Sequence, residues 1–354
     1  MKARQAPGVG RRDFLKAAGG AMVAAGLPGA TAGGPASPHT PRRLVVIVAD
    51  TCRADHLGCY GSKRVKTPCL DALAAEGACG LLDNVAPGIT PGSGPAHLGL
   101  FGYDPLRYDI GRGLLSALGI GFPIQPGDLA ARINFCTLDP KTGFVTDRRA
   151  GRIPTEKNQQ LVEILNRIEI PGCQVFVRTV KEHRACVVFR APDLYDDLND
   201  TDPQSEGKEP PLPVKAEDPR SERAAEFVRE FIRQATELLK DQHPANGILL
   251  RGFARYEKLP QLPETYKMRC AAIANYPMYR GVTSLVGMEV LPCGDTLEEE
   301  FATLEQHFQA YDFFFLHVKK TDSYGEDGNW QAKVHVIEEV DALLPRARAH
   351  ETSL

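Results

Sequence analysis

Several patterns that would place this chain in a familiar class are missing from its 354 residues. The nine cysteines contain no C-x-x-C pair, which excludes zinc-ribbon spacing, and their odd number leaves at least one thiol outside any disulfide framework. The formal net charge is −3, whereas nucleic-acid binding requires a clustered basic surface. No internal repeat is visible, which excludes a solenoid. The composition therefore predicts no nucleic-acid partner, and local arginines must bind any anionic substrate.

The first forty residues lack an apolar run long enough for a stable membrane span. They contain "GRRDFLKAAGGAMVAAGLPGATAGGPASP", in which Arg11 and Arg12 precede a weakly apolar Ala/Gly stretch. This pattern resembles a twin-arginine export signal, in which the arginine pair is read by a receptor. We expect residues 1–40 to lie outside the fold and the chain to be exported to the periplasm by the twin-arginine machinery. A disordered tail with a chance arginine pair is the alternative.

The remaining chain is typical of a globular α/β protein, with 43% apolar and 25% charged residues. Residues 44–50, "LVVIVAD", predict a fully buried parallel strand that ends at Asp50. Residues 67–77 predict a helix capped by Thr67 and stopped at Gly77, and residues 79–85 predict a further strand. Because ligands of open α/β sheets bind beyond the carboxyl ends of strands, Asp50 is a candidate site residue.

Strand and helix alternate again late in the chain. The pattern predicts a strand over 283–290, a helix from the capping box of Thr296 and Glu299 to about residue 310, a strand over 311–318 and a helix over 331–344. The strand over 311–318 delivers Asp322 into the loop beyond its carboxyl end.

The middle of the chain differs in character. It predicts two antiparallel strands over 172–180 and 183–191, an acidic proline-rich loop over 196–220, a helix over 219–240 and a strand over 246–254. We therefore expect a discontinuous α/β domain, residues 43–112 and 264–354, interrupted by an inserted α+β domain, residues 113–263.

Ser93 stands between glycines in "PGSGPAHLGLFGYDP". Read locally, this is a turn followed by a buried helix. The strand ends, however, carry Asp50 and the acidic segment with Asp322 and Glu326. Carboxylates beside an exposed serine suit metal-assisted phosphoryl transfer, because the metal lowers the pKa of the hydroxyl and neutralises phosphate oxygens.

The segment "DRRAGR" places Arg148, Arg149 and Arg152 within five residues. Such a cluster in a glycine-containing loop repels itself unless an anion is present, and guanidinium groups suit carboxylate and phosphate. We expect it to contact the substrate. Surface arginines are the alternative.

Long stretches resemble one enzyme family. They are "VAPGITPGSGPAHLGLFGYDPLRYDIGRG", "VTDRRAGRIPTE", "HPANGILLRGF", "AAIANYPMYRG" and "YDFFFLHVKKTDSYGEDG". Through them, residues 77–344 closely resemble the 2,3-bisphosphoglycerate-independent phosphoglycerate mutases of the archaeal type. The resemblance implies an alkaline phosphatase-like three-layer sandwich with a mainly parallel sheet. It also implies a glycolytic isomerase that interconverts 3-phosphoglycerate and 2-phosphoglycerate.

The same resemblance implies roles for individual residues. Ser93 would be phosphorylated during turnover and contact metal, Asp50 would bind one metal, and Asp322 with Glu326 would hold a second. Two divalent ions are implied, Mn²⁺ first, with Co²⁺, Zn²⁺ or Mg²⁺ as alternatives. For His97, His183 and His317, a structural role is at least as consistent with the sequence as a catalytic one. The substrate contacts implied in matching stretches are Arg132, Asp147, Arg148, Arg149, Arg152, Arg251 and Arg280.

The resemblance breaks in two places. Residues 44–76 are more similar to the opening of a sulfatase, although no cysteine lies in the C-x-P-x-R sequence that a formylglycine nucleophile requires. The mutase family also continues past the helix at 331–344 into a strand with an Asp-His pair and then a further histidine. His335 and His350 do not match these ligands. We therefore expect C-terminal strands and roughly half of a two-metal shell to be missing, leaving an exposed sheet edge.

Two other functions stay open at this stage. One is an exported hydrolase of sulfate or phosphate esters, favoured by residues 44–76 and the export signal. The other is a non-catalytic remnant, favoured by the missing C-terminal ligands. The export signal predicts a periplasmic protein, whereas the resemblance to the mutase family implies a cytoplasmic one.

Overall fold

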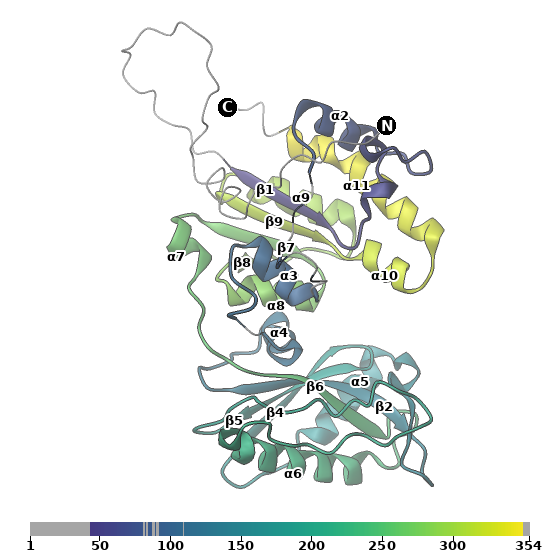
Figure 1. Cartoon of the computed structure of the whole chain (residues 1–354), viewed down its shortest axis with the longest axis vertical. Helices are drawn as coiled ribbons and strands as arrows, with labels where there is room; N and C mark the ends of the chain where they lie inside the picture. Colours follow the sequence, from purple (N-terminus) through teal and green to yellow (C-terminus); the bar gives the residue numbers. More distant parts are fainter. Residues whose placement is uncertain are drawn as a thin grey trace, which may run out of the picture. The chain divides into compact units, whose positions relative to one another are not determined.

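The computed structural model describes residues 43–349, apart from residues 81, 83, 87, 88, 90, 91 and 109. The predicted export signal and His350 lie outside these residues. The chain divides into two compact units (Figure 1). The first contains residues up to 108, 268–273 and 292 onward, and the second contains residues 109–267 and 274–291. The segment 274–291, expected in the discontinuous α/β domain, groups with the second unit.

The first unit is built on a sheet in which β1 (Leu44–Ala49), β9 (Phe313–Val318) and β7 (Cys270–Ala274) are neighbours in that order. β1 and β9 run parallel, with Leu44 opposite Phe313 and Ala49 opposite Val318. Every residue of β9 is buried, because it lies between two strands. The prediction that β1 is fully buried was wrong: it ends the strand order, and its residues stay partly exposed.

Helices complete the first unit. They are η1 (Ala54–His56), η2 (Gly58–Tyr60), α2 (Pro68–Glu76), α3 (Ser93–Leu100), α9 (Leu297–His307), α10 (Lys320–Glu326) and α11 (Trp330–Arg348). The predicted capping box of α9 is confirmed, since Thr296 and Glu299 exchange side-chain bonds with each other's backbone. Thr67 does not cap α2; its hydroxyl instead accepts from the Gly58 amide and donates to Asp71.

The strand predicted over 79–85 was wrong, because the described residues of that segment form none. Among the described residues, no helix combines the length and apolarity needed to cross a membrane.

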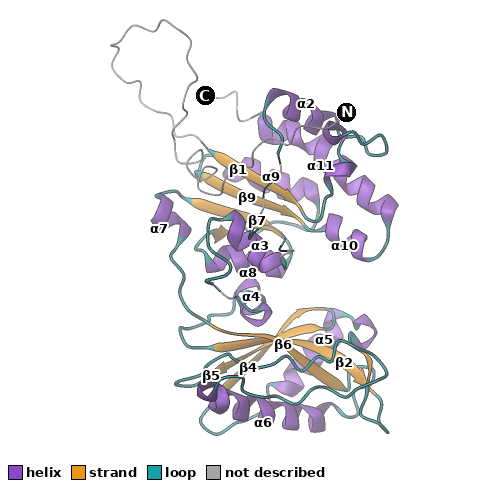
Figure 2. Ribbon diagram, in the orientation of Figure 1, coloured by secondary structure: helices purple, strands orange, loops and turns teal. Residues whose placement is uncertain are grey.

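The second unit is built on an antiparallel sheet of five strands. Its order is β3 (Val145–Asp147), β2 (Leu129–Leu138), β5 (Arg184–Arg190) and β4 (Gln174–Lys181), and β6 (Gly247–Arg255) also pairs with β2. β4 and β5 form the predicted antiparallel pair. The whole chain thus combines a sheet with parallel pairing and a separate antiparallel sheet, coloured orange in Figure 2.

One face of the antiparallel sheet carries the core of the second unit. α5 (Thr155–Leu165) and α6 (Glu222–Leu239) bury apolar side chains against it, including Phe231 against Phe189 at 5.5 Å between ring centroids. The turns η3 (Ala150–Arg152) and η4 (Pro219–Ser221) and the short α7 (Leu262–Tyr266) connect these elements. The predicted long loop over 196–220 crosses this unit with one isolated bridge, Leu198 to Ala216.

A pair of closely packed helices, α4 (Arg112–Gly119) and α8 (Pro277–Leu285), completes the second unit. A Cβ at Gly281 would lie 2.1 Å from the Leu115 carbonyl oxygen, and one at Gly119 would lie 1.8 Å from that of Pro277. The strand predicted over 283–290 was therefore largely wrong. Only β8 (Glu289–Val290) is extended, because α8 runs to Leu285 and packs against α4.

Candidate functional site

In the first unit, two carboxylates meet at one lysine beyond the ends of the parallel strands. Asp50 follows β1 and Lys319 follows β9, so the parallel pairing brings them together. The Lys319 ammonium lies 3.4 Å from Asp50 Oδ2 and also bonds Asp322 Oδ2. Thr321 fixes the turn by donating its hydroxyl to the Asp50 carbonyl at 2.7 Å. Asp50 and Asp322, predicted from separate segments, thus share one partly buried cation.

Two buried imidazoles adjoin these carboxylates. His317 Nε2 lies 3.7 Å from Asp50 Oδ2, and its ring centroid lies 5.3 Å from that of His97. Burial lowers the pKa of His317 well below its usual value, assisted by His97 and Lys319, and burial also lowers the pKa of His97. Both rings are therefore neutral at physiological pH and add no positive charge beside Asp50.

Ser93 is the exposed first residue of α3, preceded by Gly92 in an extended conformation. The predicted helix is therefore present, and its first residue is exposed. The Ser93 carbonyl accepts a 2.7 Å hydrogen bond from His97 Nδ1. This bond connects the first turn of α3 to the His97, His317 and Asp50 side chains. The backbone of Ser93 thus contacts His97, whose ring adjoins His317 beside Asp50.

The cluster provides only part of a metal site. The carboxylates of Asp50 and Asp322, with the nearby imidazole of His317, are donor groups that suit Mn²⁺ or Zn²⁺. Glu326, predicted as a ligand, ends α10 and is exposed. Within residues 43–349, leaving aside the undescribed positions, no group of three or more His, Cys, Asp or Glu side chains is arranged to hold a metal ion. The residues present therefore do not fit two complete metal shells.

In the second unit, strand register places arginines together on one face of the antiparallel sheet. Arg132 of β2 lies directly opposite Arg251 of β6, and Arg184 of β5 lies opposite Asn134, two residues further along β2. Directly paired residues, and residues two apart, project from the same face. Arg132, Arg184 and Arg251 hence share a face, opposite to the apolar core formed by Ile133 and its neighbours.

Arg132 is the most perturbed of these cations. Burial, together with the positive charges of Arg112, Arg184 and Arg251, lowers its pKa to about 10. Its Nε atom is buried without a hydrogen-bond partner among the described residues. Because like charges opposite one another destabilise a sheet, this arrangement is typical of a site for an anion that brings its own negative charge.

Asp202 balances part of this positive charge. Its fully buried carboxylate accepts two bonds from Arg148, at 2.8 and 2.7 Å, and lies 3.1 Å from Arg251 Nη1. Burial alone would raise the pKa of Asp202, but the bonds from Arg148 and the charge of Arg251 bring it below its usual value. Arg148 is therefore already committed to a protein carboxylate, whereas Arg132 is not.

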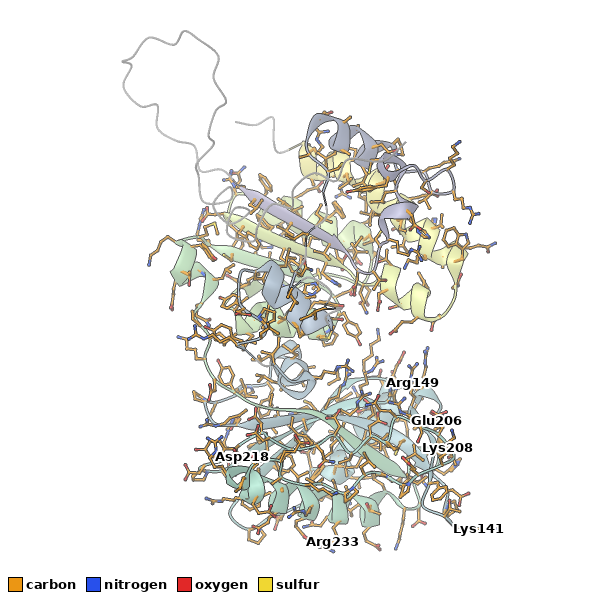
Figure 3. The ribbon with its side chains drawn as sticks, viewed as in Figure 1. Lys141, Arg149, Glu206, Lys208, Asp218 and Arg233 are labelled. Carbon is orange, nitrogen blue, oxygen red and sulfur yellow. The ribbon has the colours of Figure 1, made fainter. Side chains whose placement is uncertain are left out.

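The loop after β3 has a strained backbone. Ala150, Gly151 and Arg152 have φ values of 48°, 64° and 53°, a left-handed conformation that is costly for the two non-glycine residues. Asp147 holds the loop by accepting from the amides of Arg149 and Gly151, at 2.7 and 2.6 Å. Asp147, predicted as a substrate contact, thus organises the arginine loop. Arg149 is exposed on it, in the region labelled with Glu206 in Figure 3.

Arg280 and His183, also named from the sequence, belong to the second unit as well. Arg280 is on α8, one turn after Tyr276, whose hydroxyl accepts a 3.2 Å bond from Arg184. Burial lowers the pKa of His183 to about 3, with further lowering by Arg184, Arg149, Arg152 and Arg132. The sequence reasoning missed Arg112, Arg184 and Tyr276. The available signal for Arg184 was its position directly before the apolar run of β5.

Comparison with known proteins gives one consistent family. Residues 74–246 match the family model for 2,3-bisphosphoglycerate-independent phosphoglycerate mutase. The chain is 51% identical over 290 residues to a probable enzyme of this name from Aquifex aeolicus, covering 79% of this chain and 71% of the relative. It is 50% identical over 320 residues to one from Thermus thermophilus, covering 88% and 78%.

Solved structures agree. The cofactor-independent phosphoglycerate mutase from Thermoplasma acidophilum aligns with a TM-score of 0.53 at 30% identity, covering 75% of this chain and 71% of that one. A Pyrococcus horikoshii protein aligns with a TM-score of 0.70 at 25% identity, covering 86% and 77%. The earlier resemblance is thereby confirmed at the level of the family. The chain belongs to the 2,3-bisphosphoglycerate-independent phosphoglycerate mutases, a family of isomerases.

Proposed function

We propose that this protein interconverts 3-phosphoglycerate and 2-phosphoglycerate, the reaction of glycolysis, through a phosphoserine at Ser93. The observation that carries the proposal is the arginine face of the second unit, in a chain 51% identical to a probable mutase. The substrate carries a phosphate and a carboxylate, which are the anions that guanidinium groups bind best. Arg132 offers a buried cation of this kind.

The proposed reaction uses the same serine twice. Its Oγ attacks phosphorus, the bond from phosphorus to the substrate oxygen breaks, and the hydroxyl proton of Ser93 passes to that oxygen. The glycerate stays bound and reorients, and its other hydroxyl attacks the phosphoserine and returns the proton. Arg132, Arg251 and Arg280 would hold the carboxylate and phosphate during this reorientation. Arg149 and Arg152, on the strained loop, would bind the same anions. Retention of glycerate is what makes the result an isomerisation and not a hydrolysis.

The test replaces the nucleophile. Ser93→Ala should lower kcat by at least about 1,000-fold, since loss of a covalent nucleophile leaves only binding. Thr236→Ala, an exposed hydroxyl on α6, is the matched control and should retain activity. Mass spectrometry after mixing with 3-phosphoglycerate should find one phosphoryl group on wild type and none on Ser93→Ala. A phosphorylated Ser93→Ala protein would overturn the proposal.

We further propose divalent metal ions at the carboxylate cluster of the first unit, Mn²⁺ first, with Ser93, Asp50, Asp322 and Glu326 as the expected ligands. The convergence of Asp50 and Asp322 on one cation supports this, whereas a complete shell is not formed by the described residues. Elemental analysis of the purified protein should find metal, and Asp50→Asn should reduce it. Protein that binds no metal in excess Mn²⁺ would contradict this proposal and support the non-catalytic alternative.

Two finer features of the sequence are proposals as well. Residues 44–76 would form the sulfatase-like opening of an alkaline phosphatase-like three-layer fold, supported by a family match that begins only at residue 74. A competing hydrolase function of the same superfamily predicts turnover of aryl sulfates or aryl phosphates. Parallel assays with these esters and 3-phosphoglycerate separate the two functions.

Residues 1–40 would direct twin-arginine export, supported by Arg11 and Arg12 before an Ala/Gly stretch. Substitution of both arginines by lysine should block export and keep a tagged protein in the cytoplasm. The family reaction would take place in that compartment if the chain is not exported. Export of the substituted protein would contradict the proposal.

A further inference from the structure

The first unit contains a cavity whose lining includes none of the residues proposed above for the mutase reaction. It has a volume of about 730 Å³, within the range of small-molecule sites. Two segments far apart in the sequence form it, the turns after β1 and the junction of α10 with α11. Its lining comprises Arg53, Asp55, His56, Gly61, Ser62, Lys63, Arg64, Tyr324, Gly325, Gly328, Trp330 and Lys333, which we call the basic pocket.

The charge of the basic pocket is one-sided. It has four lysine and arginine side chains but a single carboxylate, Asp55. That carboxylate is occupied by Arg53, through bonds of 2.9 and 2.6 Å, and by His56 at 2.9 Å. These bonds lower the pKa of Asp55 to about 2, so it stays ionised and neutralises Arg53. No carboxylate of the lining is left for the other three cations.

Those cations differ in how they are held. Lys333 donates to the carbonyl and hydroxyl of Thr51, at 3.0 and 3.3 Å, and so keeps its full positive charge on neutral partners. Lys63 and Arg64 are exposed, and neither forms an ion pair with any described residue. The pocket is thus prepared to attract an anion, with Lys333 held by Thr51 and two further exposed cations in its lining.

An aromatic surface accompanies the charge. Trp330 begins α11 and remains 43% exposed, and His56 meets it edge-on at 4.9 Å between ring centroids. Tyr324 is also part of the lining. A large exposed ring beside unpaired cations suits a ligand with both a flat apolar part and a negative group. The exposed indole ring of Trp330 therefore distinguishes this pocket from a surface that only presents charged side chains to water.

We propose that the basic pocket binds aryl esters of phosphate or sulfate. The ring of the ligand would lie against Trp330, and its tetrahedral oxyanion would contact Lys63, Arg64 and Lys333. The lining segment at residues 53–64 precedes residues 74–246, which match the mutase family model, and it belongs to none of the stretches that resemble that family. The pocket would therefore give this chain a ligand class that differs from the non-aromatic phosphoglycerates, independently of the proposed isomerisation.

The single tryptophan of the chain makes the proposal directly measurable. Because Trp330 is the only one, all tryptophan fluorescence reports on this pocket. Phenyl phosphate and phenyl sulfate, titrated separately into the full-length protein, should change the fluorescence saturably, and their relative affinities identify the preferred oxyanion. Phenol and inorganic phosphate should each bind at least about tenfold more weakly than the better ester, since each lacks one half of the ligand.

The decisive variant is Lys63→Ala with Arg64→Ala, which should weaken ester binding by about tenfold. A matched pair, Lys240→Ala with Arg233→Ala on α6, should leave it unchanged. Both substituted pairs are on the surface, and circular dichroism checks that each protein folds. No saturable signal, equal binding of inorganic phosphate, or unchanged affinity in the first variant would each overturn the proposal. Ser93→Ala should bind the esters normally, which separates this result from the fate of the mutase proposal.

Discussion

The two units of this chain concentrate opposite kinds of chemistry. The first brings together carboxylates and neutral imidazoles, with Lys319 joining Asp50 and Asp322. The second gathers Arg132, Arg184 and Arg251 on one face of its sheet, where Asp202 and Asp200 offset part of the charge of Arg251. The acidic cluster is therefore balanced by Lys319 in its own unit, whereas no described carboxylate forms an ion pair with Arg132. The comparison teaches that, of these two clusters, the arginine face is the one whose charge balance requires a ligand.

The largest effect is expected where the arginine face has its own counter-charge. Asp202→Asn should lower the free energy of unfolding by about 3 kcal/mol, because it leaves Arg148 and Arg251 facing a neutral group. Glu237→Gln, which removes an exposed pair with Lys240, should cost less than about 1 kcal/mol. Urea unfolding of both variants measures the difference.

The pH dependence of Asp202 has a definite sign. Its pKa in the folded protein lies below the usual value of 3.8, so its contribution is present above that pH and is lost as pH falls through the folded value. The stability difference between wild type and Asp202→Asn should therefore shrink below about pH 4. A constant difference would contradict the ion pair as its cause.

Arg132→Met tests whether the arginine face is built for a ligand. We expect kcat/KM for 3-phosphoglycerate to fall about 100-fold, or about 2.7 kcal/mol, while unfolding stability stays equal or rises. The reason is that Arg132 is partly buried beside Arg112, Arg184 and Arg251, and its Nε has no hydrogen-bond partner among the described residues. Arg233→Met, in an exposed pair on α6, is the control. Parallel loss of stability and activity would indicate a structural role instead.

Lys319→Met tests the balance of the acidic cluster. Its removal leaves Asp50 and Asp322 facing each other, and should destabilise the protein by about 1–2 kcal/mol. Added Mn²⁺ should raise the melting temperature of this variant more than that of wild type. Lys320→Met, the neighbouring lysine, should behave as wild type. A variant indifferent to Mn²⁺ would contradict the metal proposal.

The smallest effect near neutral pH involves His183. Its pKa falls from 6.5 to about 3 on folding, so the histidine stabilises the protein above pH 6.5, and this contribution is progressively lost as pH falls towards 3. At about pH 5.5 the loss should be about 1 kcal/mol relative to neutral pH. His183→Gln should remove this slope, whereas His335→Gln, an exposed histidine, should retain it.

Local signals predicted much of the first unit. The capping box of Thr296 and Glu299 is a short-range pattern, and the apolar run before Asp322 requires only a buried strand. The parallel pairing then brings Asp50 and Lys319 together, as expected for residues at strand ends. Lys319 itself was missed, because a lysine after a strand has no distinctive pattern.

The second unit was less predictable at the level of the site. Arg184 lies opposite Asn134 only because β2 and β5 adopt one register, which no local pattern specifies. The error over 283–290 has a similar origin. Its β-branched and apolar residues favour a strand. Gly119 and Gly281, however, let the backbones of α4 and α8 come into contact, and this packing stabilises the helix α8 in place of a strand.

By itself, the amino-acid sequence determined the family, the strands that carry Asp50 and the segment of Asp322, and the helix that begins at Ser93, because each depends on short-range patterns or long identical stretches. Only the tertiary structure decided that Arg132, Arg184 and Arg251 share a face, that Lys319 joins two carboxylates, and that Trp330 lies among the cations of the basic pocket. The physical reason is that strand register and helix packing set these contacts, and both depend on residues far apart in the chain.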